Sequence, residues 1–140
     1  MIEALRTFGQ SGAVLAIGLA TGAAWIMAIV VPNVSYDRLD YSRADGFVRE
    51  MLKKGSHQIT FILLVGSALA VLGGAVGAAI AAGIAALGFL TNQWTLSSLS
   101  GKTVPGARRK RKTQRVVAVS LTLIFTLTAA AAAVMAMFGI

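Results

Sequence analysis

Charged residues are confined to short segments of this chain, and long apolar stretches separate them. No Asp, Glu, Lys or Arg occurs in residues 7–36, 55–101 or 116–140. A helix that rises about 1.5 Å per residue needs roughly 20 mostly apolar residues to cross a hydrocarbon layer of about 30 Å. The first and last stretches are therefore each long enough for one membrane span, and the middle stretch is long enough for two.

Helix-breaking residues indicate where these spans end. Pro32 and Asn33 discourage continuation of the first helix, and Gly73 and Gly74 divide the middle stretch into two helices joined by a tight hairpin. The four spans are expected at about 11–31, 57–72, 75–94 and 116–138. The pattern predicts an all-α integral membrane protein, a single membrane domain over 1–140 that folds as an antiparallel bundle of four transmembrane helices.

A short amphipathic segment precedes the second span. Ser42 and Asp45 have the spacing of a capping box at the start of a helix. Apolar side chains then recur at helical spacing, and Gly55 is typical of the residue that follows a helix C-terminus. This pattern predicts a separate helix at about 43–54. Its apolar face either lies along the inner membrane surface as an interfacial helix or packs on the bundle.

Composition and charge support a membrane location and indicate the orientation. The 140 residues are 56% hydrophobic and only 13% charged, too few charges to cover the surface of a water-soluble domain. Twelve of the 13 basic residues, all except Arg6, lie between the first and second spans or in a basic loop at about 100–115. An even number of spans separates these segments, so both are expected in the cytoplasm, with both termini outside. We expect a multi-pass membrane protein.

The beginning of the chain does not have the composition of a cleaved signal peptide. Glu3 and Arg6 cancel in charge, and the apolar stretch that follows is longer than the core of a typical signal. We therefore expect the first span to be retained in the mature protein.

The densest basic cluster lies directly before the last span. It comprises Arg108, Arg109, Lys110, Arg111, Lys112 and Arg115. Nucleic-acid phosphates attract such clusters, but no aromatic side chain interleaves this one, so we expect no nucleic-acid partner. Beside a span on the cytoplasmic side, the cluster is expected to set the topology and to contact anionic lipids of the cytoplasmic leaflet.

The predicted spans contain no acidic or basic side chain, which argues against proton-coupled transport. The chain has one histidine, His57, and no cysteine, so neither a metal shell nor a catalytic acid–base pair can be assembled at a recognisable spacing. We expect no enzymatic activity, no catalytic residues, no metal and no cofactor.

Two groups of residues in the spans are candidates for other roles. Small residues at close helical spacing are typical of tightly packed helices, either within one chain or between chains. They are Gly18, Gly22, Gly73, Gly77, Ala78 and Ala82. Asn92, Gln93 and His57 lie near the inner ends of the third and second spans and are candidates for a polar path or a partner contact. The favoured role is structural: Asn92 is expected to form a hydrogen bond between helices, and His57 to contact headgroups or a neighbouring loop at the interface.

Part of the pattern is similar to a known family. The stretch Ala28-Ile-Val-Val-Pro32, with Ala44 and Phe47 in the amphipathic segment and Asn92 near the end of the third span, resembles an uncharacterised family of small bacterial inner-membrane proteins. That family has four spans and is related to a eukaryotic transmembrane protein. Its last span often opens with an aromatic-His-Ser element, and Gln114-Arg115-Val116 stands there instead. The resemblance implies the architecture and the location, and it implies no known activity.

These observations predict a non-enzymatic integral membrane protein. We expect an accessory or scaffold component of a membrane complex, in contact with another membrane protein, or a homo-oligomer. The alternative is a small-solute channel or permease, in which Asn92, Gln93 and the hydroxyl groups of the last span line the path.

Overall fold

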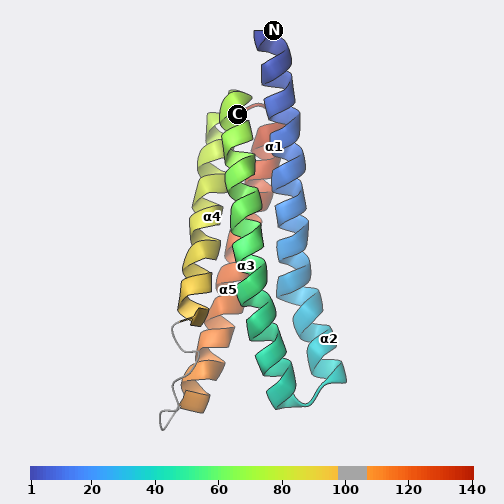
Figure 1. Ribbon diagram of the computed structural model, residues 1–140, viewed down its shortest axis with the longest axis vertical. Helices are drawn as coiled ribbons and strands as arrows, with labels where there is room; N and C mark the ends of the chain where they lie inside the picture. Colours follow the sequence, from blue (N-terminus) through green and yellow to red (C-terminus); the bar gives the residue numbers. More distant parts are fainter. Residues whose placement is uncertain (98–106) are drawn as a thin grey trace.

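The structure is an all-helical bundle, as the sequence predicts (Figure 1). The computed structural model describes the backbone of residues 1–97 and 107–140, and the side chains of residues 1–94, 113 and 115–140. The elements are α1 (Ile2–Trp25), the π-helical turn η1 (Ile26–Val30), α2 (Val31–Arg38), α3 (Tyr41–Leu72), α4 (Val76–Ser97) and α5 (Ala107–Met137). Four helices are long and apolar enough to cross a membrane.

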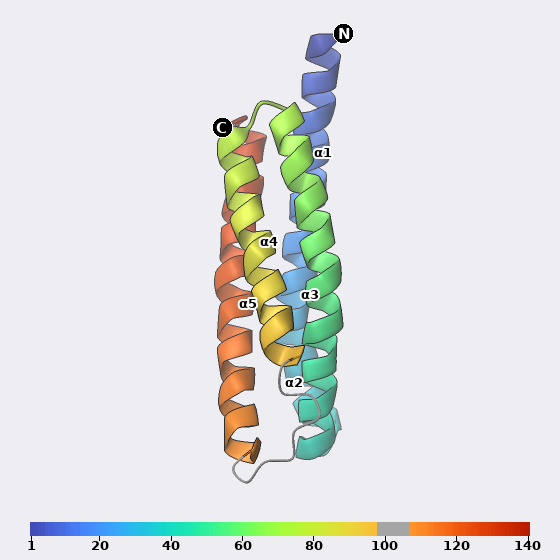
Figure 2. The ribbon, with the colours of Figure 1, turned by 60° about the vertical axis from the view of Figure 1, so that its left-hand side comes forward.

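The helices form a closed antiparallel ring. α3 packs between α1 and α4, and α5 completes the ring between α4 and α1 (Figures 1 and 2). Both chain termini and the turn between α3 and α4 lie at one end, called here the terminal end. The turn between α2 and α3 lies at the other end, called here the basic end.

Side chains of α1 hold the terminal end together. The turn at Gly73 and Gly74 requires glycine, because Gly74 has a φ of 76°. Arg6 Nε donates a hydrogen bond of 3.3 Å to the Gly73 carbonyl, and Gln10 Nε2 donates one of 3.1 Å to the carbonyl of Ala136. Both acceptors are carbonyls near helix ends, so α1 is tied to the α3–α4 turn and to the end of α5.

Small side chains form most of the core, and large apolar side chains cover much of its outside. Alanine side chains account for most of the buried apolar positions, and Ile17, Leu63 and Phe89 fill the space between them. Exposed positions on the outside include Leu15, Leu19, Ile84, Leu87, Ile124 and Leu127. Helices that associate in lipid have this distribution, because close backbone approach rather than hydrophobic burial drives their packing.

The first helix does not stop at Pro32, so that boundary prediction was wrong. The Val31 N–H bonds to the carbonyl of Ile26, five residues back, which makes η1 a π-helical turn. Pro32 then occupies the first turn of α2, where its missing N–H disturbs the helix least. The helical path therefore continues to Arg38.

The prediction of a separate interfacial helix at 43–54 was also wrong. α3 is continuous from Tyr41 to Leu72, so this segment extends the second predicted span. Ala44, Val48 and Leu52 are buried, as in the alternative in which the apolar face packs on the bundle. Gly55 does not end a helix: a Cβ there would collide with Met27 Sδ, so it allows close approach of η1 and α3.

The basic loop predicted at about 100–115 is shorter on its C-terminal side. α5 begins at Ala107, so residues 107–115 belong to its first turns. The last span, predicted at about 116–138, agrees with the spanning segment Arg115–Met137, and the helix that contains it extends back to Ala107.

Candidate functional site

Asn92 is the only fully buried amide side chain among the described residues, and it joins α4 to α5. Its Nδ2 donates a hydrogen bond of 2.9 Å to Thr122 Oγ1 and a weaker one of 3.4 Å to the Ala118 carbonyl. Asn92 Oδ1 has no hydrogen-bond partner in the described part of the chain. The predicted hydrogen bond from Asn92 to a neighbouring helix is therefore confirmed, and its Oδ1 remains available as an acceptor.

The neighbouring threonines of α5 satisfy their own hydroxyl groups. Thr122 Oγ1 donates to the Ala118 carbonyl at 2.7 Å, and Thr126 Oγ1 donates to the Thr122 carbonyl at 2.6 Å. These bonds to carbonyls one turn back are the usual solution for hydroxyl side chains inside a helix. The Thr122 hydroxyl donates its hydrogen to Ala118, and its oxygen accepts the hydrogen bond from Asn92.

α3 presents a row of hydroxyl groups to α4. Thr60 Oγ1 lies 3.5 Å from the Ala86 carbonyl, and Ser67 Oγ donates to the Ala79 carbonyl at 2.8 Å. Ser56, one turn before Thr60 on the same face, is fully buried, but its Oγ has no partner in the described structure. The spacing of Ser56, Thr60 and Ser67 was visible in the sequence, yet sequence reasoning did not select Ser56.

The structure does not bring the three predicted polar residues together. His57 is exposed on the outside of α3, whereas its neighbour Ser56 points into the core. Gln93 is half-buried beside the fully buried Asn92. Among the described residues, the buried polar side chains of α3, α4 and α5, called here the buried polar layer, are Ser56, Thr60, Asn92, Thr122 and Thr126.

A second polar cluster ties α2, α3 and α5 together at the basic end. Arg115 of α5 forms an ion pair with Asp45 of α3, and the side chains of the two residues are 13% and 20% exposed. The same guanidinium group donates to the hydroxyl of Tyr36, and at 3.3 Å to that of Tyr41. It also lies 5.1 Å and 5.5 Å from the centroids of these two rings, within the range of cation–π attraction.

The local sequence explains how this cluster forms. Tyr36 lies near the end of α2, and Tyr41 and Asp45 lie four residues apart at the start of α3. The turn at Leu39 and Asp40 reverses the chain and brings the two rings to a centroid distance of 5.7 Å. Arg115 completes the cluster from α5. Asp45 therefore acts as the counter-ion of Arg115 and not as part of a capping box: the N-cap of α3 is Asp40, without a side-chain cap bond.

The predicted lipid-binding cluster divides into two parts. Arg115 is turned inward onto Asp45 and the tyrosines, so its assignment to lipid contact was wrong. The other members are Arg108, Arg109, Lys110, Arg111 and Lys112, and their side chains lie outside the described residues.

The small residues predicted for helix packing fall on two different surfaces. Gly73, Gly77, Ala78 and Ala82 pack inside the bundle: Ala78 and Ala82 are fully buried, and a Cβ on Gly77 would lie 2.6 Å from the methyl carbon of Met135. Gly18 and Gly22 face outward, and nothing lies within 4 Å of a Cβ built on either.

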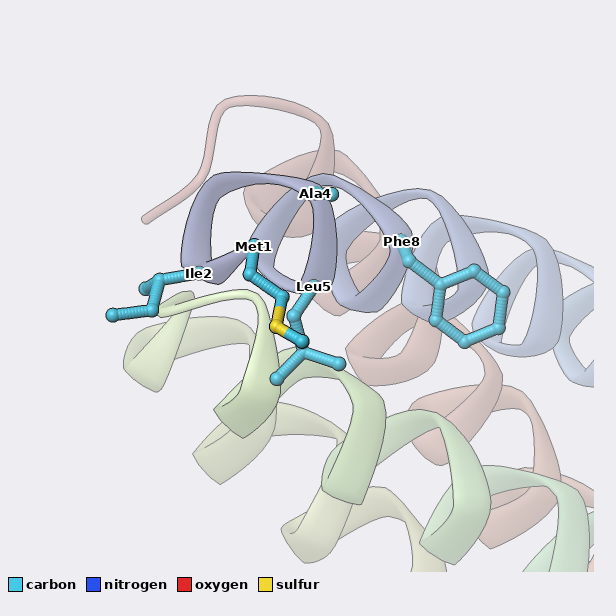
Figure 3. A pocket seen from close by; sticks show the side chains of 5 residues that line it. All are labelled: Met1, Ile2, Ala4, Leu5 and Phe8. Carbon is cyan, nitrogen blue, oxygen red and sulfur yellow. The ribbon is translucent and has the colours of Figure 1, made fainter.

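An apolar hollow lies at the start of α1, beyond the end of the ring. It has a volume of about 560 Å³ and is lined by Met1, Ile2, Ala4, Leu5 and Phe8 (Figure 3). The lining side chains are all apolar and contain no group that could orient a polar ligand. Among the described residues, no three His, Cys, Asp or Glu side chains are grouped as a metal ion requires.

The fold and these sites define a class, an all-helical bundle with four helices suited to a membrane. Comparison with protein-family models, curated proteins and solved structures finds no match for the chain. The resemblance of Pro32, Ala44, Phe47 and Asn92 to a four-span family therefore stays a prediction.

Proposed function

We propose that this chain is a non-enzymatic integral membrane protein, an accessory or scaffold component that self-associates or packs on a larger membrane complex. The apolar outer surface and the four helices of spanning length support its insertion in a bilayer. The basic end faces the cytoplasm in this proposal, because the basic residues concentrate there, and both termini lie outside. The location is the bacterial inner membrane, with anionic lipid at the basic end.

One observation carries the proposed association. Gly18 and Gly22 have the spacing of a helix-pairing motif, and the bundle leaves the space above both of them open. Inside the bundle α1 uses a different set of positions, among them Ala13, Ile17 and Ala20. A glycine lowers helix stability, so two glycines on an outer face have a reason to be there if a second backbone approaches them.

The proposed occupant of this face is a second copy of the chain. In a twofold pair the same patch meets itself, and the line of small or polar side chains formed by Ala4, Ser11, Gly18 and Gly22 offers no bulk or charge that would prevent it. Leu15 and Leu19 flank the line and would form the ridges that pack beside the groove.

Size-exclusion chromatography with light scattering in mild detergent tests this proposal. The parent protein is expected to be a dimer, and the double variant Gly18→Leu/Gly22→Leu a monomer. The matched control is Ala68→Leu/Ala131→Leu, which places two leucines at exposed positions on α3 and α5 and should remain dimeric. A parent that is monomeric, and that brings down no membrane protein in stoichiometric amount, would contradict both forms of the proposal.

The buried polar layer favours a second candidate, a small-solute channel or permease. Asn92 and Ser56 place polar atoms without partners inside an otherwise apolar bundle, as solute paths do. A conducting protein would show flux in liposomes when purified alone, and Asn92→Leu would abolish that flux. The scaffold proposal expects no flux from either protein.

A further inference from the structure

Two fully buried oxygen atoms, Ser56 Oγ on α3 and Asn92 Oδ1 on α4, have no hydrogen-bond partner in the described structure. Buried polar atoms without partners are rare in folded proteins, and each one requires a physical explanation such as a bound water or ion. We propose that a water molecule is bound in the bundle core between these two oxygens.

The register of the two helices places both oxygens at nearly the same depth. The Thr60 hydroxyl meets the Ala86 carbonyl and so aligns α3 with α4. Ser56 is four residues before Thr60, and Asn92 is six residues after Ala86 on the antiparallel helix. At about 1.5 Å per residue the two positions differ in depth by roughly 3 Å along the bundle axis, so both oxygens lie at one level of the core.

The hydrogen-bonding capacities of the two side chains suit a water molecule. The Nδ2 of Asn92 already donates to Thr122 and Ala118. The remaining polar atom, Oδ1, is an amide oxygen and can only accept. The Ser56 hydroxyl can both donate and accept. A water that donates to Asn92 Oδ1 and accepts from Ser56 Oγ satisfies both atoms and keeps one hydrogen for a third partner.

The π-helical turn of the first helix supplies that third partner. The Val31 N–H bonds to Ile26, and Pro32 has no N–H, so the Met27 carbonyl receives neither of the bonds expected from the following turn. The side chain of Met27 packs against Gly55, the residue next to Ser56, which brings this turn of the first helix beside that part of α3. A buried water typically makes about three hydrogen bonds, which matches Ser56 Oγ, Asn92 Oδ1 and the Met27 carbonyl.

A high-resolution structure of the full chain in detergent or nanodiscs tests the site directly. The expected result is a water within about 2.7–3.2 Å of both Ser56 Oγ and Asn92 Oδ1. A core without water, or a direct hydrogen bond between Ser56 and Asn92, would overturn the proposal.

A double-mutant cycle tests the same site in solution. If one water serves both side chains, losing either partner weakens it, and the melting-temperature losses of Ser56→Ala and Asn92→Leu will not add in the double variant. The control pair is Ser67→Ala with Asn92→Leu, whose losses should add, because Ser67 bonds to Ala79 far from the layer. Additive losses in the first pair would contradict a shared water. If Asn92→Leu does not fold, Asn92→Ala takes its place in both cycles.

A monovalent cation is the competing guest, because all three proposed partners can present oxygen lone pairs. Melting of the parent protein in NaCl, KCl and choline chloride at equal ionic strength separates the two. Bound water predicts equal melting temperatures in all three salts. A rise confined to one alkali-metal salt, and lost in Asn92→Leu, would replace the water by that cation.

Discussion

Arg115 and Asp45 form an ion pair between α5 and α3, and both side chains are largely withdrawn from solvent. The two residues lie 70 positions apart in the chain and meet at the basic end of the bundle. Tyr36 and Tyr41 cover the guanidinium group, and Tyr36 brings α2 into the same cluster. A single arginine thus connects three helices, α2, α3 and α5, at the basic end.

Removing the charge of Asp45 should destabilise this end. In Asp45→Asn the Arg115 charge loses its counter-ion while remaining mostly buried, and we expect a loss of roughly 1–3 kcal/mol in the free energy of unfolding. Thermal unfolding in mild detergent measures the effect. The control is Glu50→Gln, which removes the exposed pair with Lys54 at 2.8 Å and should leave the melting temperature unchanged. Equal effects of the two substitutions would show that the pair of Arg115 and Asp45 does not stabilise the fold.

Arg115→Lys distinguishes the effect of the positive charge at this position from the effect of the planar guanidinium group. Lysine keeps the attraction to Asp45 but loses the planar donors and the contact with both tyrosine rings. We expect about 0.5–1.5 kcal/mol of destabilisation, less than for Asp45→Asn. Thermal unfolding of the two variants under identical conditions decides the order, and a lysine variant as stable as the parent would show that charge alone matters.

The number of long helices could be predicted from the sequence because it depends on local composition. Charge-free stretches of spanning length and the pair Gly73-Gly74 are visible without knowledge of packing. Pro32 and Gly55 were misinterpreted as helix ends because their roles depend on tertiary structure. A π-helical turn accommodates the proline, and the glycine makes room for Met27.

The polar contacts were harder to predict, since they need the register between helices. Asn92 was identified as a hydrogen-bonding residue, but its partner Thr122 follows only from the packing of α4 on α5. Arg115 belonged to a run of basic residues, and nothing in the sequence distinguished it from its neighbours. The structure shows its role, because its guanidinium group pairs with Asp45.

Glycines at the crossing of α1 and α3 should not tolerate a methyl group. A Cβ on Gly9 would lie 2.6 Å from the backbone nitrogen of Gly73, and neither backbone can move without disturbing the turn. Gly9→Ala is expected to cost about 1–3 kcal/mol in the free energy of unfolding. Gly46→Ala is the matched control: nothing lies within 4 Å of a Cβ there, so the melting temperature should hold or rise. A tolerated alanine at Gly9 would contradict the close crossing.

The proposed orientation can be tested with single cysteines, because the chain contains none. Ser42→Cys and Thr113→Cys are expected to react with a membrane-impermeant maleimide only after the cytoplasmic side is opened. Thr7→Cys should react in intact cells, since it lies in the first turns of α1 at the terminal end. Labelling of positions 42 and 113 from opposite sides would refute the topology, whichever way the chain is inserted.

Thr122→Val should weaken the contact between α4 and α5 without changing its shape. The substitution removes the acceptor of the 2.9 Å bond from Asn92 and leaves the amide with the 3.4 Å bond to Ala118. Hydrogen bonds between apolar helices are modest, so we expect a loss of about 0.5–1.5 kcal/mol in the free energy of unfolding. Thr128→Val is the control, because Thr128 bonds only to the Ile124 carbonyl of its own helix. Thermal unfolding that ranks Thr128→Val as the more harmful change would show that Asn92 does not hold α4 to α5.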